Sequence, residues 1–338
     1  MNAATRIARR GAALRALRET LWSWGFVEAD TPQLVPGPGL EPHIAPLTVP
    51  VRTSLDERQA AVPRYLITSP ELALKRTVAA GVGRVFQLGH VFRDGERTRR
   101  HAPEFTLLEW YRGPGTLAEI VDDTMGLARA VARAVSEHSD MPVALDLDVP
   151  ARITVCDAFA QAGIDLSAAI DETDDGDAGA LPRRAKAAGV ELVGAELSFD
   201  DAFFAVMDQR VEPSLPHDKL VVVERWPARM AVLARRCDDD ARYASRLEMY
   251  AHAPSHGCLE LCNAFDELRD PVEQRARFVA DNAERARLNK PVLPLDEDFL
   301  AALPSLPEPT AGNALGVDRL LMLLCGGDLD DVVALPFR

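Results

Sequence analysis

The chain has 338 residues, of which 47% are hydrophobic and 27% charged, which is enough for one large or two medium cores. Its 52 acidic and 38 basic residues give a formal net charge of −14, which argues against binding nucleic acid through a broad basic surface. The sequence has no run near the ~18 apolar residues of a membrane span. Its five scattered cysteines form no CxxC pair, which favours a reducing, cytoplasmic compartment.

The N-terminal segment predicts a helix, because Leu14, Leu17 and Leu21 recur at helical spacing and Gly25 stands where a helix would end. Its many arginines are typical of a transit peptide, but no apolar segment precedes a cleavage site, so we interpret it as structural. After it we expect a strand over residues 26–32, a loop over 36–46 and a strand over 64–68.

A second helix is predicted over residues 69–80. Ser69 can cap it, Pro70 suits its first turn, and Glu71 places an acid beside its positive end. Strands are then expected over 84–92 and 105–111, followed by a helix from 116 to about 135 that opens with a capping box.

The C-terminal half begins with residues 171–178, rich in Asp and Gly, which predict a solvated loop or the border of an inserted subregion. We then expect strands over 220–224, 246–250 and 258–265, and helices starting at 270 and over 316–324. Strands follow strands here instead of alternating regularly with helices. This order favours an α+β fold, an antiparallel sheet flanked by helices. We expect one domain over residues 1–338, with a variable subregion around 140–215.

Neither common phosphate loop, GxxxxGK[ST] or GxGxxG, occurs in the sequence, so a nucleotide site would have to come from side chains on a sheet. Strand alternation places Phe105, Leu107, Glu109 and Tyr111 on one face. A carboxylate and a phenol beside apolar residues suit a pocket that holds an amine and stacks a ring. The basic segment 97–101 is, taken alone, more typical of a solvated turn than of a phosphate site.

Residues 312–319 join a strand of small residues to an apolar helix. Arg319 lies in the first turn of that helix, where its guanidinium and the helix N-terminus can together hold phosphate. The glycines of this segment are also compatible with close packing alone.

Together these segments resemble the class II aminoacyl-tRNA synthetases. Residues 92–109 are similar to motif 2, residues 312–319 to motif 3, and the first helix with the strand ending at Pro32 to motif 1. Residues 69–71, 101–112 and 260–268 resemble the lysyl subfamily. The resemblance covers nearly the whole chain and implies the class II fold, with a motif 1 interface that makes a homodimer.

Lysyl-tRNA synthetases carry an N-terminal OB-fold domain that reads the anticodon. Here the catalytic motifs begin almost at Met1, so we expect that domain to be missing and tRNA not to be the acceptor. The chain then resembles the ligases that aminoacylate a lysine of elongation factor P. Ala314 and Ser69 match residues of these ligases where the tRNA synthetases have glycine and usually alanine.

The resemblance implies a role for each matching residue. Arg93 and Arg319 would be catalytic and bind phosphates, Phe105 would stack on adenine, and Glu248 and Glu260 would hold Mg²⁺. The implied ATP site comprises Arg93, Glu96, His101, Phe105 and Arg319. The implied amino-acid pocket comprises Ser69, Glu71, Glu109, Tyr111, Asn263, Glu267 and Ala314.

Three features depart from the family or from simple geometry. Motif 2 has Gly95 in place of its first glutamate, and Asp94 or Glu96 could substitute for it. The hairpin segment 251–257 is longer than usual; its two histidines, His252 and His256, are compatible with a metal site but more typical of a solvated loop. Strict strand alternation separates two of the assigned acids, Glu260 and Glu267, unless a bulge intervenes.

The resemblance implies an ATP-dependent, AMP-forming ligase. It would activate (R)-β-lysine or lysine as an adenylate and transfer it to a lysine side chain of elongation factor P. Two alternatives stay open. One is a non-catalytic protein that binds ATP or an amino acid and regulates a partner, and the other is aminoacylation of a different carrier or of tRNA.

Overall fold

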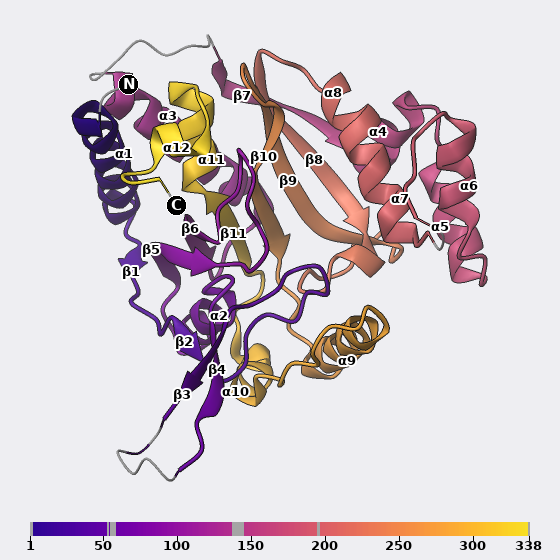
Figure 1. Cartoon of the computed structure of the whole chain (residues 1–338), viewed down its shortest axis with the longest axis horizontal. Helices are drawn as coiled ribbons and strands as arrows, with labels where there is room; N and C mark the ends of the chain where they lie inside the picture. Colours follow the sequence, from indigo (N-terminus) through magenta and orange to yellow (C-terminus); the bar gives the residue numbers. More distant parts are fainter. Residues whose placement is uncertain (1–2, 53, 55–58, 137–144, 195–196, 337–338) are drawn as a thin grey trace.

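The computed structural model describes residues 3–52, 54, 59–136, 145–194 and 197–336. Its centre is an eight-stranded sheet in the order β1-β5-β6-β11-β10-β9-β8-β7 (Figure 1). The β1–β5 and β7–β8 pairs are parallel and the other neighbouring pairs are antiparallel, which confirms the predicted α+β class. The strands are β1 (Val27–Glu28), β5 (Arg84–Phe92), β6 (Glu104–Arg112), β7 (Asp146–Thr154), β8 (Lys219–Pro227), β9 (Tyr243–Ala253), β10 (Gly257–Asp266) and β11 (Ala311–Gly316).

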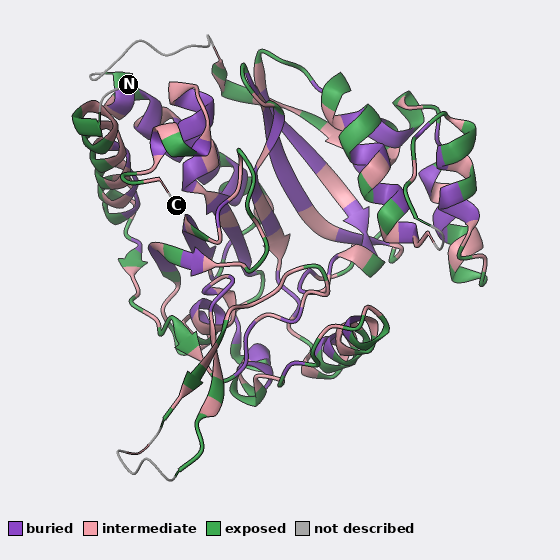
Figure 2. Cartoon of the chain, in the orientation of Figure 1, coloured by how far each residue is buried: buried purple, intermediate pink, exposed green. Residues whose placement is uncertain are grey.

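Helices cover one face of this sheet. Leu17 and Leu21 of the first helix pack with Leu108 and Trp110 of β6 in the largest apolar cluster of the described chain. Strand alternation therefore turns the even-numbered residues of β6 towards these helices, away from the face that carries Phe105 and Glu109. Figure 2 shows that the central strands are largely buried. The helices are α1 (Ala3–Ser23), α3 (Leu117–Ser136), α11 (Val317–Cys325) and α12 (Leu329–Val332).

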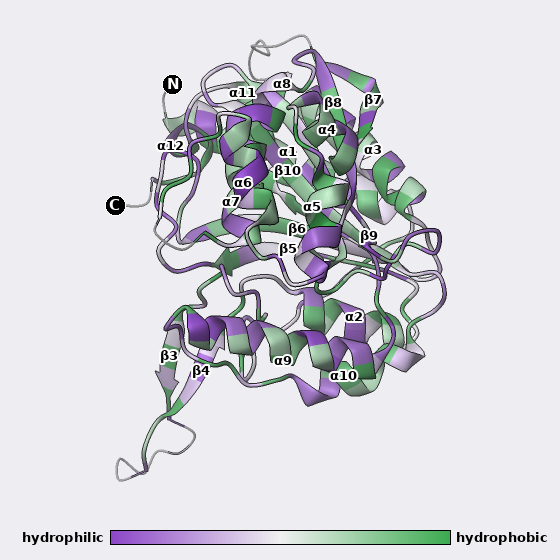
Figure 3. Ribbon diagram, turned by 90° about the vertical axis from the view of Figure 1, so that its right-hand side faces the viewer, coloured by the Kyte–Doolittle hydropathy of each residue, from purple (hydrophilic) through white to green (hydrophobic). Residues whose placement is uncertain are grey.

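Two groups of elements cover the ends of the opposite face. Near β5 and β6, Leu74, Phe278 and Phe299 form a cluster with Val85 and Tyr111. Figure 3 shows α9 and α10 below the main sheet, with hydrophilic and hydrophobic residues mixed along α9. This group contains α2 (Glu71–Ala79), α9 (Pro271–Arg287), α10 (Glu297–Ala302), the 3-10 helix η3 (Leu303–Ser305) and a small sheet of β2 (Leu34–Val35), β4 (Val62–Leu66) and β3 (Thr48–Val51).

The second group packs on β8 and β9. Phe159 and Phe203 stack on each other and Phe203 contacts Trp226, so this helical segment has its own apolar cluster against the sheet. It contains α4 (Val155–Gln161), α5 (Leu166–Asp174), α6 (Ala180–Ala187), α7 (Phe199–Val206), the π-helix η1 (Met207–Val211), α8 (Glu212–Ser214) and the 3-10 helix η2 (Ala228–Met230).

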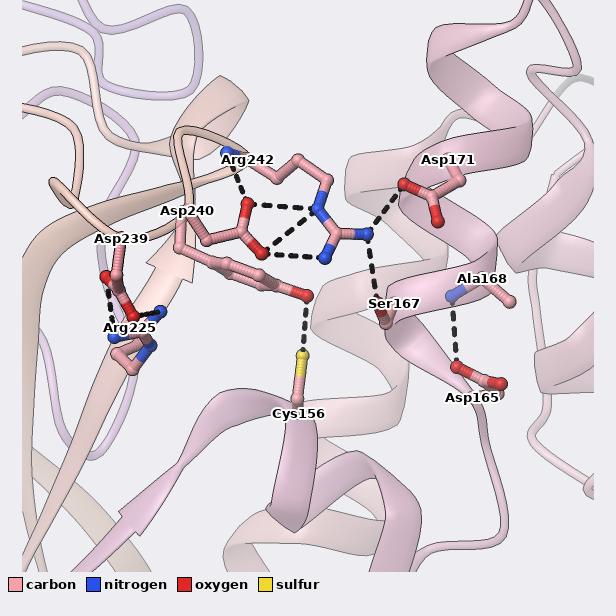
Figure 4. Close-up of polar contacts among 10 residues, drawn as sticks. Cys156, Asp165, Ser167, Ala168, Asp171, Arg225, Asp239, Asp240 and Arg242 are labelled. Atoms are coloured by element: carbon pink, nitrogen blue, oxygen red, sulfur yellow. Dashed lines mark hydrogen bonds and ion pairs between the residues drawn. The ribbon is translucent and has the colours of Figure 1, made fainter.

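Arg242, just before β9, ties this helical group to the sheet. Its guanidinium binds Asp240 on its own turn and donates to Asp171 (2.7 Å) and Ser167 (3.2 Å) of α5 (Figure 4). The prediction of a loop over residues 171–178 was therefore wrong for its first part. Asp165 caps α5, and the helix continues through the acidic stretch to Asp174 because its apolar residues pack inward.

The predicted start of α2 needs a smaller correction. The helix begins at Glu71 with Pro70 in the N-cap position, whereas Ser69 lies outside it. The Ser69 hydroxyl still accepts a hydrogen bond from the Glu71 amide (3.0 Å). In contrast, the capping box of α3 is confirmed, because Thr116 and Glu119 each accept from the amide of the other.

Among the described helices, none is both long and apolar enough to cross a membrane.

Candidate active site

A cavity of about 370 Å³ lies on the sheet face opposite α1, α3 and α11. It is bordered by α2 on one side and by Phe204 of α7 on the other. A cavity of this size can hold a small-molecule ligand. It is lined by eleven of the fourteen residues expected to form a site: Ser69, Glu71, Arg93, Glu96, His101, Phe105, Glu248, Glu260, Asn263, Ala314 and Arg319.

The sheet register explains how residues distant in sequence meet here. Glu109 of β6 pairs with Ala314 of β11, which pairs with Asn263 of β10, which pairs with Glu248 of β9. Directly paired residues of neighbouring strands present their side chains to the same face. The four therefore form one row across the sheet.

A β-bulge brings Glu260 to that face. The β9–β10 register shifts between Glu260 and Cys262, so that Glu260 pairs with Tyr250 and Asn263 with Glu248. The extra residue reverses the alternation of β10 at this point. The expected conflict between the assigned roles of Glu260 and Glu267 is thereby removed. The bulge turns Glu260 to the face that carries Asn263, which is the face to which alternation assigns Glu267.

Arg93 and Phe105 form one end of the cavity. The Arg93 guanidinium carbon lies 5.0 Å from the centre of the Phe105 ring, a cation–π contact. The Arg93 Nε atom is buried and has no hydrogen-bond partner among the described residues. A buried donor without a partner is ready for an anionic ligand.

Arg319 lies beside this end, in the first turn of α11. It donates to the Glu260 carbonyl (2.8 Å), to the Glu260 carboxylate (3.2 Å) and to His101 Nε2 (2.7 Å). Because Arg319 can only donate, His101 Nε2 must accept, and we assign the ring proton to Nδ1, which lies 2.9 Å from Thr98 Oγ1. Burial and Arg319 lower the pKa of His101 to about 4, so this histidine is neutral near pH 7.

Glu248 and Glu260 are the acids assigned to a metal. Glu248 is buried and accepts from Arg246 (2.5 Å) and from the Tyr250 hydroxyl. Burial and the nearby Glu260 raise the pKa of Glu248. Two carboxylates facing one cavity fit Mg²⁺, which takes one or two protein carboxylates together with substrate phosphates and waters. No group of three or more His, Cys, Asp or Glu residues in the described chain could hold a metal by itself.

Three of the expected residues lie beneath the cavity floor and do not line it. Glu109 is 1% exposed; its carboxylate accepts from Ser69 Oγ (2.6 Å) and Tyr111 Oη (2.6 Å). Burial and Glu71 raise the pKa of Glu109. Burial also raises the pKa of Glu267, which is 2% exposed; Lys75 lowers it, while Glu71 and Glu109 raise it further. These acids form a second, deeper polar cluster next to the cavity.

Lys75 belongs to this cluster and was missed by the sequence analysis. It is 2% exposed, and its ammonium forms ion pairs with Glu71 and, at 2.5 Å, with Glu267. Burial opposes its charge, but Glu267 and Glu71 more than compensate, so its pKa is raised. The i,i+4 spacing of Glu71 and Lys75 on α2 was an available signal for half of this arrangement.

A model of the family "tRNA synthetases class II (D, K and N)" matches residues 2–338. The chain belongs to this family. It is 35% identical over 332 residues to the "Elongation factor P--(R)-beta-lysine ligase" of Sodalis glossinidius, covering 97% of this chain and 94% of that protein. The protein of the same name from Hamiltonella defensa is 33% identical over 98% of this chain and 94% of its own length. The one from Pseudoalteromonas translucida is 34% identical, over 94% and 90% respectively.

Gly95 is the clearest departure from the motif 2 of class II synthetases. Its φ is +79°, and a Cβ there would meet nothing within 4 Å, so the turn uses the left-handed conformation that glycine permits. The next residue, Glu96, lines the cavity, which fits the expected substitution for the missing glutamate.

The histidines of the long β9–β10 hairpin are not in a solvated loop. His252 stacks on His217, with ring centres 3.7 Å apart. The His256 side chain is 4% exposed and its Nε2 lies 2.8 Å from the Gly327 carbonyl oxygen. Both histidines therefore contact other parts of the protein. The extra residues of the hairpin lengthen the paired strands as far as Ala253 and Gly257 instead of extending the turn.

Proposed function

We propose that this protein is an ATP-dependent ligase that activates (R)-β-lysine or lysine as an adenylate and transfers it to a lysine side chain of elongation factor P. The names of relatives that match nearly the whole chain support this proposal. The observation that carries it is one cavity lined by Arg93, Arg319, Glu248 and Glu260, with a cluster of buried acids next to it.

ATP would bind at the Arg93 end. We assign the α-phosphate to Arg93, the outer phosphates to His101 and Arg319, and adenine to the Phe105 ring. Glu96 would orient the nucleotide in place of the missing glutamate. Glu248 and Glu260 would hold Mg²⁺, whose charge would offset that of the phosphates.

The amino acid would bind beside the deep acids. Ser69, Glu71, Asn263 and Ala314 would line its backbone end. Glu109, Tyr111 and Glu267 would receive the distal ammonium, since buried carboxylates and a phenol oxygen stabilise a cation that brings its own hydrogen-bond donors.

Two steps follow from this placement. A carboxylate oxygen of the amino acid attacks the α-phosphorus, and the bond to pyrophosphate breaks. The neutral acceptor amine then attacks the carbonyl carbon of the adenylate, AMP leaves, and the new amide nitrogen loses a proton. Arg93 and Arg319 would stabilise the charge that develops on the phosphoryl oxygens, and positioning supplies much of the remaining acceleration.

The test is ATP–pyrophosphate exchange measured with lysine, (R)-β-lysine and unrelated amino acids in parallel, followed by labelling of elongation factor P. We expect exchange with a lysine isomer and label on the factor. Nucleotide binding without exchange for any amino acid would instead indicate the regulatory alternative. Exchange followed by charging of tRNA, with no label on the factor, would refute the proposed acceptor.

The proposal includes a homodimer, one catalytic domain with a variable subregion around 140–215, and a cytoplasmic location matching that of a translation factor. Exposed apolar side chains on the motif 1 segment support the dimer. Trp22 and Ile7 of α1 are 50% and 49% exposed, and Val27 of β1 is 55% exposed. A second copy would cover this surface.

A further inference from the structure

The loop carrying Glu41 is held over the cavity through its main chain. The guanidinium of Arg285, a residue of α9 that is 2% exposed, donates to the carbonyls of Glu41 and Ile44, each at 3.0 Å. Lys290 donates to the carbonyl of Pro42 (2.6 Å). Two cations therefore hold three main-chain carbonyls of the loop, and neither donates a hydrogen bond to Glu41 Oε2.

The Glu41 side chain points inward. Its Oε2 atom is buried and has no hydrogen-bond partner among the described residues. Gly39 makes room for it, since a Cβ at that position would come within 2.5 Å of Oε2. Glu41 lines the main cavity and also a side pocket of about 20 Å³ that it shares with Ser69 and Asp281.

Four of the five other acids that line this cavity, all except Glu96, have a cationic partner among the described residues. Glu71 pairs with Lys75, Glu248 with Arg246, and Glu260 with Arg319. Asp318 pairs with Arg10 at 2.6 Å. Glu41 thus presents a buried carboxylate oxygen to the cavity that still needs a donor, and a buried acceptor without one is costly.

Glu41 lines the same cavity as Glu71 and Arg93, and both affect its carboxylate. Burial raises the pKa of Glu41 and Glu71 raises it further, whereas a hydrogen bond from its own backbone amide, Arg93 and Lys75 lower it. The carboxylate therefore lies within range of both Glu71 and Arg93. Arg93 marks the end where the substrate carboxylate would meet the α-phosphorus.

We propose that Glu41 binds the ammonium group next to the substrate carboxylate, and so selects diamino acids over acids that carry only a distal amine. This inference rests on the proposed function. An ammonium brings three donors and a positive charge, which satisfies the unpartnered oxygen and favours the ionised form of the carboxylate. A substrate without this amine would leave the oxygen unsatisfied in a closed site.

The test compares two compounds and three proteins. The compounds are the lysine isomer that gives the faster exchange and ε-aminocaproic acid, which keeps the carboxylate and the distal amine but lacks the adjacent one. The proteins are the wild type, Glu41→Gln, and Asp281→Asn. Asp281 is a matched control, because it also has a buried oxygen without a described partner but lines only the side pocket.

We expect Glu41→Gln to weaken use of the diamino acid by about 10- to 100-fold in kcat/KM, the range for a hydrogen bond to a charged group. Binding of ε-aminocaproic acid, measured by competition or calorimetry, should change less than about threefold. The KM for ATP and the unfolding temperature should stay the same. Asp281→Asn should leave the preference for the diamino acid intact.

Equal weakening of both compounds, an equal effect of Asp281→Asn, or no effect of Glu41→Gln would each overturn the role of Glu41. These outcomes differ from a failure of the proposed function, which would appear as no exchange in the wild type. In that case calorimetry with the same two compounds still tests Glu41, because binding needs no turnover.

Discussion

Replacing Lys75 by methionine removes a buried charge and keeps the length of the side chain. The ammonium of Lys75 pairs with Glu71 and Glu267 and lies about 6 Å from the ring centres of Tyr111, Phe265 and Phe299. Water cannot replace it in such a site. Lys75→Met therefore leaves buried carboxylates without their cation, which costs about 3–5 kcal/mol.

This loss has a measurable size. With an unfolding entropy of about 2.1 cal/mol/K per residue, a chain of 338 residues has about 0.7 kcal/mol/K in total, so 4 kcal/mol lowers the melting temperature by about 6 °C. The free energy of unfolding, from urea titration, should fall by a large part of the total of about 5–15 kcal/mol.

The defect should also grow with pH. Burial raises the pKa of Glu267 and Lys75 opposes that rise, so the variant raises the pKa further. An acid whose folded pKa exceeds its unfolded value binds more protons when folded, so stability falls as pH rises between the two values. Each pH unit in that window changes the free energy by up to about 1.4 kcal/mol per proton. Wild type and variant lose stability alike until the pH exceeds the folded pKa of Glu267 in the wild type, and above it only the variant continues to do so, so the defect should be larger at about pH 9.5 than at about pH 7.

Two further variants check this reasoning. Lys75→Met combined with Glu267→Met should recover much of the loss, because a pair of apolar side chains replaces a pair of buried charges. Lys219→Met, which removes a partly exposed pair with Asp146 (3.6 Å), should cost less than about 1 kcal/mol. A loss below about 1 kcal/mol for Lys75→Met, or a loss independent of pH, would refute the account of this cluster.

Three other changes test the proposed site and assembly. Arg319→Met should slow ATP–pyrophosphate exchange by about 100- to 1,000-fold with the fold intact by circular dichroism, and a loss under tenfold would remove Arg319 from the mechanism. Gly95→Ala should lower stability by about 1 kcal/mol in urea titration, because its φ of +79° disfavours a side chain; unchanged stability would contradict this. Trp22→Asp should convert the proposed dimer to a monomer in sedimentation, whereas Val272→Asp, at an exposed site on α9, should not. Equal masses for both variants would contradict the interface.

Periodicity and capping chemistry predicted the elements that form the cavity wall. The face of β6 that carries Phe105 and Leu107 follows from alternation alone, because a strand has only two faces. The bulge before Cys262 was required by the assigned roles of Glu260 and Glu267, although nothing in the sequence locates it. Local sequence rules therefore predicted best those features that depend on a single strand.

The remaining features depend on contacts between distant segments. Lys75 forms an ion pair with Glu267, although most strands of the sheet lie between them in the sequence. Only tertiary packing brings the two side chains together. Glu41 is an ordinary acid in a Pro- and Gly-rich loop until Arg285 fixes that loop over the cavity. His256 became buried because its hairpin packs beside Gly327, near the C-terminal end of the chain. The spacing of residues within a short stretch of sequence does not indicate which distant segments will contact each other.

The central position of β11 has a consequence for synthesis of the protein. β6 pairs with β5, its neighbour in sequence, on one side and with β11, from the far end of the chain, on the other. Until β11 leaves the ribosome, an apolar strand edge stays open on a long nascent chain, and such edges recruit other strands. The final thirty or so residues thus both join the two halves of the sheet and end a period of aggregation risk, which makes early termination more harmful here than the small number of lost residues suggests.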